Sequence, residues 1–243
     1  MNTFFSTQED SSVGVDLKMF NNLVKLLSYI DEIIKKRDLG SFENIVKVAM
    51  LSNKKDVSLK LTLVLGYVAT KDVKFLIKAL VNLMNESSLP ISKLIYAASA
   101  IMGMDRLIII GAKYGLLNHK FVNLIIDNLT CRELTTLTGV SGLSDSIGKE
   151  LLIKVLSRAL STTYCKPARQ VALEVIAKAL SKGKLGVGDL VSMLQRLNMS
   201  LLIVRNRKGA IKEIRIISKT VDTFPVDTPK LNDLAHLLLT AST

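Results

Sequence analysis

The chain has 243 residues, of which 49% are hydrophobic, and it carries a net charge of +12 with a pI near 9.7. This length is enough for one large domain or two smaller ones without disulfide support. The excess of basic residues favours a polyanionic partner, namely nucleic acid, an anionic membrane surface or an acidic protein. The high apolar fraction favours self-association, so we expect a homo-oligomer.

The N-terminal residues 1–15 are polar and lack periodicity, which predicts a flexible tail. Glu9 and Asp10 stand where a signal peptide carries cationic residues, so we expect an intracellular protein, cytoplasmic or nuclear. A membrane-spanning helix needs about 20 apolar residues, and the uncharged apolar stretches are shorter. The sequence therefore predicts no transmembrane segment.

Helical periodicity begins at residue 16 and predicts an amphipathic helix over residues 16–38. Its apolar residues recur at three- and four-residue spacing: Leu17, Phe20, Leu23, Val24, Leu27, Ile30 and Ile34. The helix ends in the basic run Lys35, Lys36 and Arg37, a candidate membrane-facing cluster. Ordinary core packing explains the same apolar pattern.

Shorter helices follow, each preceded by a residue that can cap a helix N-terminus. These candidate caps are Ser41, Asp56, Asp72, Ser92, Asp105, Asn118 and Thr130. Their starts recur at the length of one short helix plus a tight turn, although no self-similar repeat motif is visible. The sequence predicts an all-α fold, either a helical bundle or a solenoid-like array of short helices, with one C-terminal β-hairpin.

Three glycines and three serines interrupt the periodicity at residues 138–148, where we place a junction between domains. The predicted N-terminal helical domain covers residues 16–138, and the C-terminal helical domain covers residues 149–243. In the second, we expect helices over residues 149–160, 167–181 and 189–198. An irregular link at Phe224-Pro225 and Thr228-Pro229 precedes a closing helix over residues 230–239.

The predicted β-hairpin spans residues 201–219, with β-branched runs at 201–205 and 211–217 and Gly209 in the turn. Residues 196–219 contain seven basic residues and one acid, Glu213, so they carry +6 of the chain's net charge. Clustered cations of this kind gain from counterion release on a phosphate backbone. The candidate binding residues are Arg196, Arg205, Arg207, Lys208, Lys212, Arg215 and Lys219.

Two helices joined by a short turn and followed by a basic hairpin resemble, in order, the elements of winged-helix DNA-binding domains. The resemblance covers residues 149–219 and concerns architecture alone. It implies a recognition helix at residues 189–198 and a wing at residues 205–208. That helix offers one basic residue, Arg196, and begins with Asp189, which suits groove reading poorly.

Catalytic and metal-binding patterns are weak. His119 and His236 are far apart in sequence, and neither is expected to be a general base. Residues 142–150 imitate a phosphate loop, but the spacing has one residue too many and Glu150 replaces the magnesium-binding hydroxyl. Cys131 and Cys165 lack metal-site spacing, so we expect reduced, buried thiols. We expect no enzyme activity, no cofactor and no metal.

The sequence favours a non-enzymatic binding or assembly protein that contacts nucleic-acid phosphates, RNA or DNA, without sequence-specific reading. Aromatic residues make up only 5% of the chain, so stacking on single-stranded bases has little support. Two alternatives stay open. The first is a peripheral membrane scaffold of the viral matrix type that self-associates on anionic lipid, and the second is a helical-repeat adaptor for an acidic protein.

Overall fold

The computed structural model describes residues 17–86, 88–205, 211–218 and 224–226, with side chains described as far as Ser200. The fold is mainly α-helical with a small antiparallel sheet near the C-terminus, so the predicted all-α class is confirmed. The chain divides into two compact units, residues 1–116 (unit 1) and 117–243 (unit 2). The predicted tail at residues 1–15 and closing helix at 230–239 lie outside the described residues.

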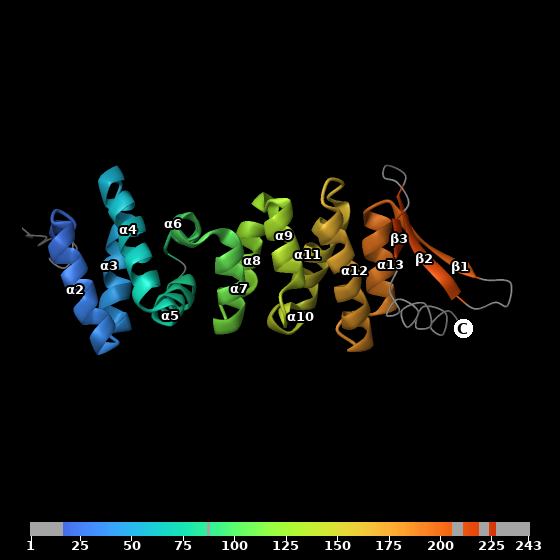
Figure 1. The fold of residues 1–243 in the computed structure, drawn as a ribbon, viewed down its shortest axis with the longest axis horizontal. Coiled ribbons are helices and arrows are strands. Elements are labelled where there is room, and N and C mark those ends of the chain that lie inside the picture. The colour runs from blue at the N-terminus through green and yellow to red at the C-terminus, as the bar shows by residue number, and fades with distance from the viewer. Residues whose placement is uncertain (1–16, 87, 206–210, 219–223, 227–243) are drawn as a thin grey trace, which may run out of the picture. The chain divides into compact units, whose positions relative to one another are not determined.

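Unit 1 is an array of six described helices (Figure 1): α2 (Leu23–Lys36), α3 (Leu39–Leu51), α4 (Lys55–Lys71), α5 (Val73–Met84), α6 (Ile91–Met102) and α7 (Met104–Tyr114). Each helix packs against the next helix and also against the next but one. The even-numbered helices therefore form one row and the odd-numbered helices a second row. This is the packing of a solenoid-like array, in which each element contacts only its neighbours.

Helices α3 and α5 run in the same direction. The Asn82 amide of α5 donates a hydrogen bond of 2.8 Å to the Glu43 carboxylate of α3. Lys47, four residues after Glu43, forms an ion pair with Glu86, four residues after Asn82 and just beyond the end of α5. Because the two contacts follow one another in the same order along both helices, α3 and α5 run in the same direction. In the other row, Gly66 of α4 lets Ile101 approach, since a Cβ there would lie 3.3 Å from the Ile101 side chain.

The first helix is shorter than the sequence predicted. The predicted helix over residues 16–38 is interrupted at residues 20–22, and Asn22 caps α2 by accepting a hydrogen bond from the Lys25 amide. Asparagine favours such a cap over a helix interior because its side chain competes for backbone donors. Ser41 is not the cap of α3 either. That role belongs to Asp38, which accepts from the Ser41 amide at 3.1 Å.

Unit 2 begins with α8 (His119–Ile125), the 3-10 turn η1 (Ile126–Asn128), α9 (Cys131–Gly139) and α10 (Leu143–Ser146). It continues with α11 (Lys149–Ser161), α12 (Lys166–Ser181) and α13 (Val187–Arg196). Helix α11 is central, because it packs against α8, α9, α10, α12 and α13. Its buried side chains are Leu151, Leu152, Val155, Leu156, Ala159 and Leu160.

The segment at which we placed the domain junction, residues 138–148, lies inside unit 2. It contains the short helix α10, which packs against α9 and α11. Leu143 and Ile147 are buried there, so this glycine- and serine-rich stretch is anchored to the core of unit 2. The division by contacts falls at Leu116 and Leu117 and therefore differs from the predicted boundary.

The predicted hairpin is present as β1 (Met199–Arg205) and β2 (Ile211–Ser218), which pair antiparallel. A third strand, β3 (Phe224–Val226), pairs with the other edge of β2. The irregular link predicted at Phe224-Pro225 is therefore wrong at these residues. Pro225 is tolerated because β3 is an edge strand, where a missing ladder donor costs little.

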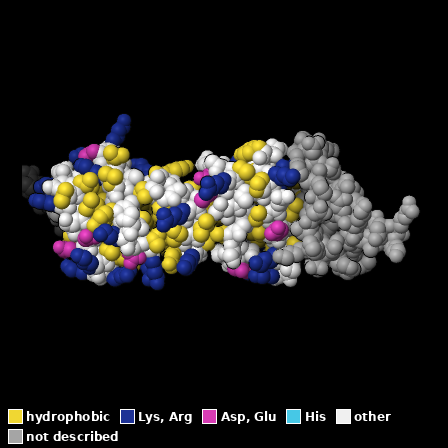
Figure 2. All heavy atoms as spheres, viewed as in Figure 1, with side chains coloured by type: hydrophobic (Ala, Val, Ile, Leu, Met, Phe, Trp, Pro, Cys, Tyr) yellow, Lys and Arg dark blue, Asp and Glu magenta, His cyan; other side chains and the backbone are white. Residues whose placement is uncertain are grey.

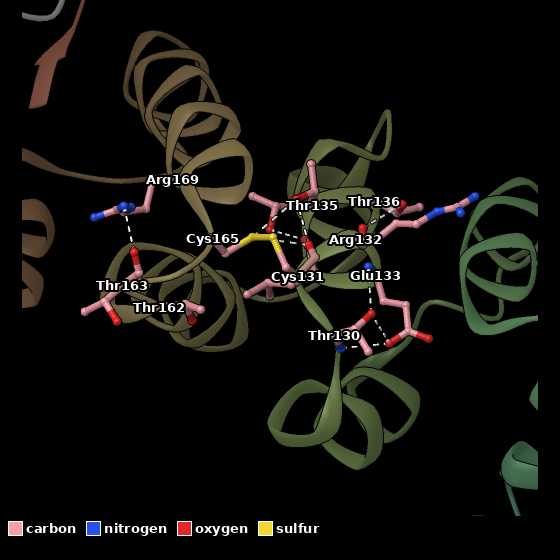
Figure 3. The surroundings of a disulfide bond; sticks show 12 residues. Thr130, Cys131, Arg132, Glu133, Thr135, Thr136, Thr162, Thr163, Cys165 and Arg169 are labelled. Atoms are coloured by element: carbon pink, nitrogen blue, oxygen red, sulfur yellow. Dashed lines mark hydrogen bonds between the residues drawn. A yellow bond between two sulfur atoms is a disulfide. The ribbon is translucent and has the colours of Figure 1, made fainter.

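The two cysteines, expected to be reduced thiols, form a disulfide (Figure 3). Cys131 is the first residue of α9, and Cys165 is the N-cap residue of α12. Because α9 packs against α12, the two Cα atoms lie 5.3 Å apart although the residues are 34 apart in sequence. The expectation of free thiols was therefore wrong. The spacing of the two cysteines in the sequence does not reveal this proximity, which results from the packing of α9 against α12.

Candidate nucleic-acid interface

Helix α13 presents one exposed stripe on the surface of unit 2. Val191, Ser192, Gln195 and Arg196 are all exposed, whereas Leu190, Met193 and Leu194 are buried. Asn198 adopts a left-handed conformation with φ of 52°, which turns the chain from α13 into β1. Arg196 therefore lies at the C-terminal end of this exposed stripe, three residues before β1 begins.

The acid that opens the predicted recognition helix, Asp189, has a structural role. Its carboxylate accepts a hydrogen bond of 2.8 Å from the Gly186 amide and lies 3.1 Å from the Lys149 ammonium of α11. The hydrogen bond from Gly186, with the nearby Lys149, lowers the pKa of Asp189 below its usual 3.8. Asp189 thus caps α13 and ties it to α11, and its charge is balanced by Lys149.

Asp189→Asn is expected to lower the Tm at neutral pH. A lowered folded-state pKa means that the carboxylate stabilises the fold above about pH 3.8 and that this stabilisation disappears as the pH falls through the lower folded pKa. The Tm difference between wild type and variant, followed by circular dichroism, should therefore shrink below pH 3.8. Glu174→Gln, an exposed carboxylate on α12, is the control and should show no such difference. A difference independent of pH would contradict this role.

The strand register separates the predicted hairpin residues. Arg215 pairs with Leu202 on one side and Pro225 on the other, whereas the neighbouring pair is Ile203 with Ile214. Because alternate residues of a strand belong to opposite faces, Arg215 shares a sheet face with Glu213, and Lys212 shares the other with Ile214 and Ile216. Arg205 ends β1, beside a bulge in the register. Arg207, Lys208 and Lys219 lie outside the described residues.

The candidate membrane-facing cluster is partly engaged within unit 1. Arg37 is the C-cap residue of α2, with φ of 57°, and its guanidinium forms an ion pair with Asp72. The Lys36 ammonium lies 3.9 Å from the Glu32 carboxylate, and Lys35 is exposed. Among the described residues no single helix has the length and apolarity of a membrane span. Helices α6 and α7 have the length and apolarity of a membrane span only when taken together, and the pair is bent by 111°.

The remaining sequence candidates have local partners. The His119 Nδ1 atom lies 3.0 Å from the Asn123 amide nitrogen, one helical turn away on α8. Asp145, in the segment that imitates a phosphate loop, pairs with Lys182 and Lys184, and the charge of Lys182 is the main cause of its lowered pKa. That segment follows helix α9, whereas a phosphate loop follows a strand. The described part of the chain contains no cluster of metal-ligating side chains.

No family model, curated protein or solved structure matches the chain.

Proposed function

We propose that the chain binds nucleic acid through its phosphates, without reading base sequence, using the C-terminal part of unit 2. The observation that carries the proposal is the exposed Arg196 at the C-terminal end of the α13 stripe, followed three residues later by the first strand of the hairpin. Residues 196–219 hold seven basic residues against one acid. Phosphate contacts need clustered cations but no particular base-reading geometry.

Two features support backbone contact over base reading. The exposed stripe of α13 has a single basic residue, Arg196, whereas recognition helices read bases through several polar and basic side chains. Tryptophan is absent and aromatic residues are only 5% of the chain, so stacking platforms are scarce. Nucleic acid of any sequence is therefore the proposed ligand.

Arg207→Glu with Lys208→Glu is expected to weaken the binding of a fluorescein-labelled oligonucleotide about tenfold or more at low salt. The slope of log affinity against log salt should also fall by roughly two, because two phosphate contacts are lost. Fluorescence anisotropy across a salt series gives both quantities for duplex DNA, single-stranded DNA and RNA.

Lys166→Glu with Lys178→Glu is the matched control, since both lysines are exposed on α12 in the same unit and the net-charge change is equal. This control should retain affinity within about threefold, because it removes long-range attraction but no contact. Equal loss in both double variants, or no loss in the hairpin variant, would reject the proposed site.

We also propose that the chain self-associates, a proposal supported by exposed apolar residues on the even-numbered row of unit 1. Leu59 and Leu63 lie one turn apart on α4 and are 68% and 51% exposed, and Tyr96 on α6 is 55% exposed. Figure 2 shows hydrophobic side chains among polar ones over the face of unit 1. Light scattering as a function of concentration tests whether Leu59→Lys with Leu63→Lys gives a smaller particle than wild type.

A further inference from the structure

Two successive turns of unit 1 meet at one end of the helix array. The turn between α2 and α3 contains Arg37, and the turn between α4 and α5 contains Asp72. The ion pair between these two residues holds the turns together. Five exposed lysines lie within six residues of Arg37 or Asp72 along the chain, and we call them the turn-edge lysines: Lys35, Lys36, Lys71, Lys74 and Lys78. The sequence predicted only Lys35 and Lys36 as a basic cluster, because the other three lysines follow more than 30 residues later.

Figures 1 and 2 show the edge of unit 1 at which these turns lie. In Figure 1, α2 and α4 both end at the lower side of unit 1, where α4 is followed by α5. In the same view, Figure 2 shows several Lys and Arg side chains gathered along that lower edge.

The acids near this edge are engaged in structural contacts. One oxygen of Asp72 accepts from the Phe75 amide at 2.9 Å, and the other accepts from Arg37. Asp38 caps α3 through the Ser41 amide and also accepts from the Ser41 hydroxyl. Among the described residues, Lys35, Lys74 and Lys78 form no ion pair. The edge therefore keeps an excess of positive charge.

Helix stability explains some of these lysines but not Lys74. Lys35 and Lys36 lie in the last turn of α2 and Lys71 in the last turn of α4, where a cation interacts favourably with the helix dipole. Lys74 lies in the first turn of α5, where the acidic N-cap residue, Asp72, is already paired with Arg37. A cation at a helix N-terminus is unfavourable, and the neighbouring lysines add repulsion. A residue that opposes local stability in this way points to a role in binding.

We propose that the turn-edge lysines form a second nucleic-acid phosphate surface, located in unit 1 and separate from residues 196–219. This inference rests on the proposed function. A nucleic-acid backbone fits better than a bilayer, because the large exposed apolar residues of the described chain include none at residues 35–38 or 71–78. Stable attachment of a helix to a bilayer needs apolar side chains that enter it.

Lys35→Glu, Lys71→Glu and Lys74→Glu, combined in the full chain, should weaken binding of a labelled oligonucleotide about tenfold or more and reduce the salt slope by about two to three. The matched control combines Lys54→Glu, Lys55→Glu and Lys93→Glu. These exposed lysines lie at the starts of α4 and α6, whereas Lys71 lies in the last turn of α4. Both triple variants carry the same net charge, and the control should bind within about threefold of wild type.

The outcomes separate the two proposals. If wild type binds and the turn-edge variant binds equally well, the second surface is rejected while the C-terminal site stands. Equal weakening in both triple variants also rejects the second surface, because net charge alone then explains it. If wild type binds no nucleic acid, both proposals fail. Turn-edge-dependent binding to phosphatidylserine vesicles with no nucleic-acid affinity overturns the inference in favour of a membrane surface.

A single substitution provides a readout that a structural role would not give. Lys74→Glu should weaken oligonucleotide binding by about threefold or more, yet leave the Tm equal to or above that of wild type, because the new carboxylate interacts favourably with the N-terminus of α5. Lys74→Arg should keep the affinity. Loss of Tm together with loss of binding in Lys74→Glu would show that Lys74 supports the fold and would overturn its assignment to the surface.

Discussion

Removing the disulfide by changing Cys131 and Cys165 to alanine is expected to destabilise unit 2 by about 3 to 4 kcal/mol. The bond closes a loop between residues 34 apart in sequence, so its loss gives the unfolded chain much greater conformational freedom. Alanine is the appropriate replacement because Cys165 is fully buried, and a serine hydroxyl there would need a partner. Urea unfolding followed by circular dichroism measures the change.

A reductant supplies the control for this prediction. Dithiothreitol should lower the urea midpoint of wild type toward that of the double alanine variant and leave the variant unchanged. Alkylation of denatured protein should label no thiol before reduction and both afterwards, since these are the only two cysteines of the chain. Labelling of both thiols in protein purified without reductant would contradict the bond.

Phe75→Ala is expected to destabilise unit 1 by about 3 to 5 kcal/mol. Phe75 is 2% exposed, and its ring packs against that of the fully buried Phe42, with ring centroids 5.5 Å apart. The substitution leaves a cavity between α5 and α3, where the two rings pack together. Urea unfolding of the full chain measures the loss.

Phe75→Leu is the matched control for the cavity, because leucine keeps most of the apolar volume. Phe75→Leu should lower the free energy of unfolding by less than half as much as Phe75→Ala. The backbone amide of residue 75 can donate to Asp72 whether that residue is phenylalanine, leucine or alanine, so capping of α5 does not account for the difference in stability. Equal costs for leucine and alanine would show that ring packing, rather than cavity volume, stabilises this contact.

Local sequence signals predicted much of the fold. Three of the seven proposed helix caps, Asp72, Asn118 and Thr130, each accept a hydrogen bond from a backbone amide three residues later. The Thr130 amide in turn donates a hydrogen bond to the Glu133 carboxylate, because the capping box depends only on residues three apart. The other four helices have a different N-cap residue. The hairpin was also predicted correctly, since its β-branched runs and glycine turn are adjacent in sequence.

Contacts between distant residues could not be predicted in this way. Cys131 meets Cys165, and Arg37 meets Asp72, because of how whole helices pack. The third strand escaped prediction because Pro225 is typical of loops and is acceptable only at the edge that β2 provides. The arrangement of the candidate site could not be predicted either. Alternation along β2 places Lys212 and Arg215 on opposite faces of the sheet, whereas the sequence shows only that both are basic.

The neighbour-to-neighbour packing of unit 1 has a consequence for how the chain folds. Its main helix contacts join elements no more than two apart in the order of the chain, so the contacting residues are close in sequence. Low contact order of this kind is associated with rapid folding. Each helix emerging from a ribosome can dock on the two already made, so unit 1 can assemble progressively during synthesis without waiting for its last helix.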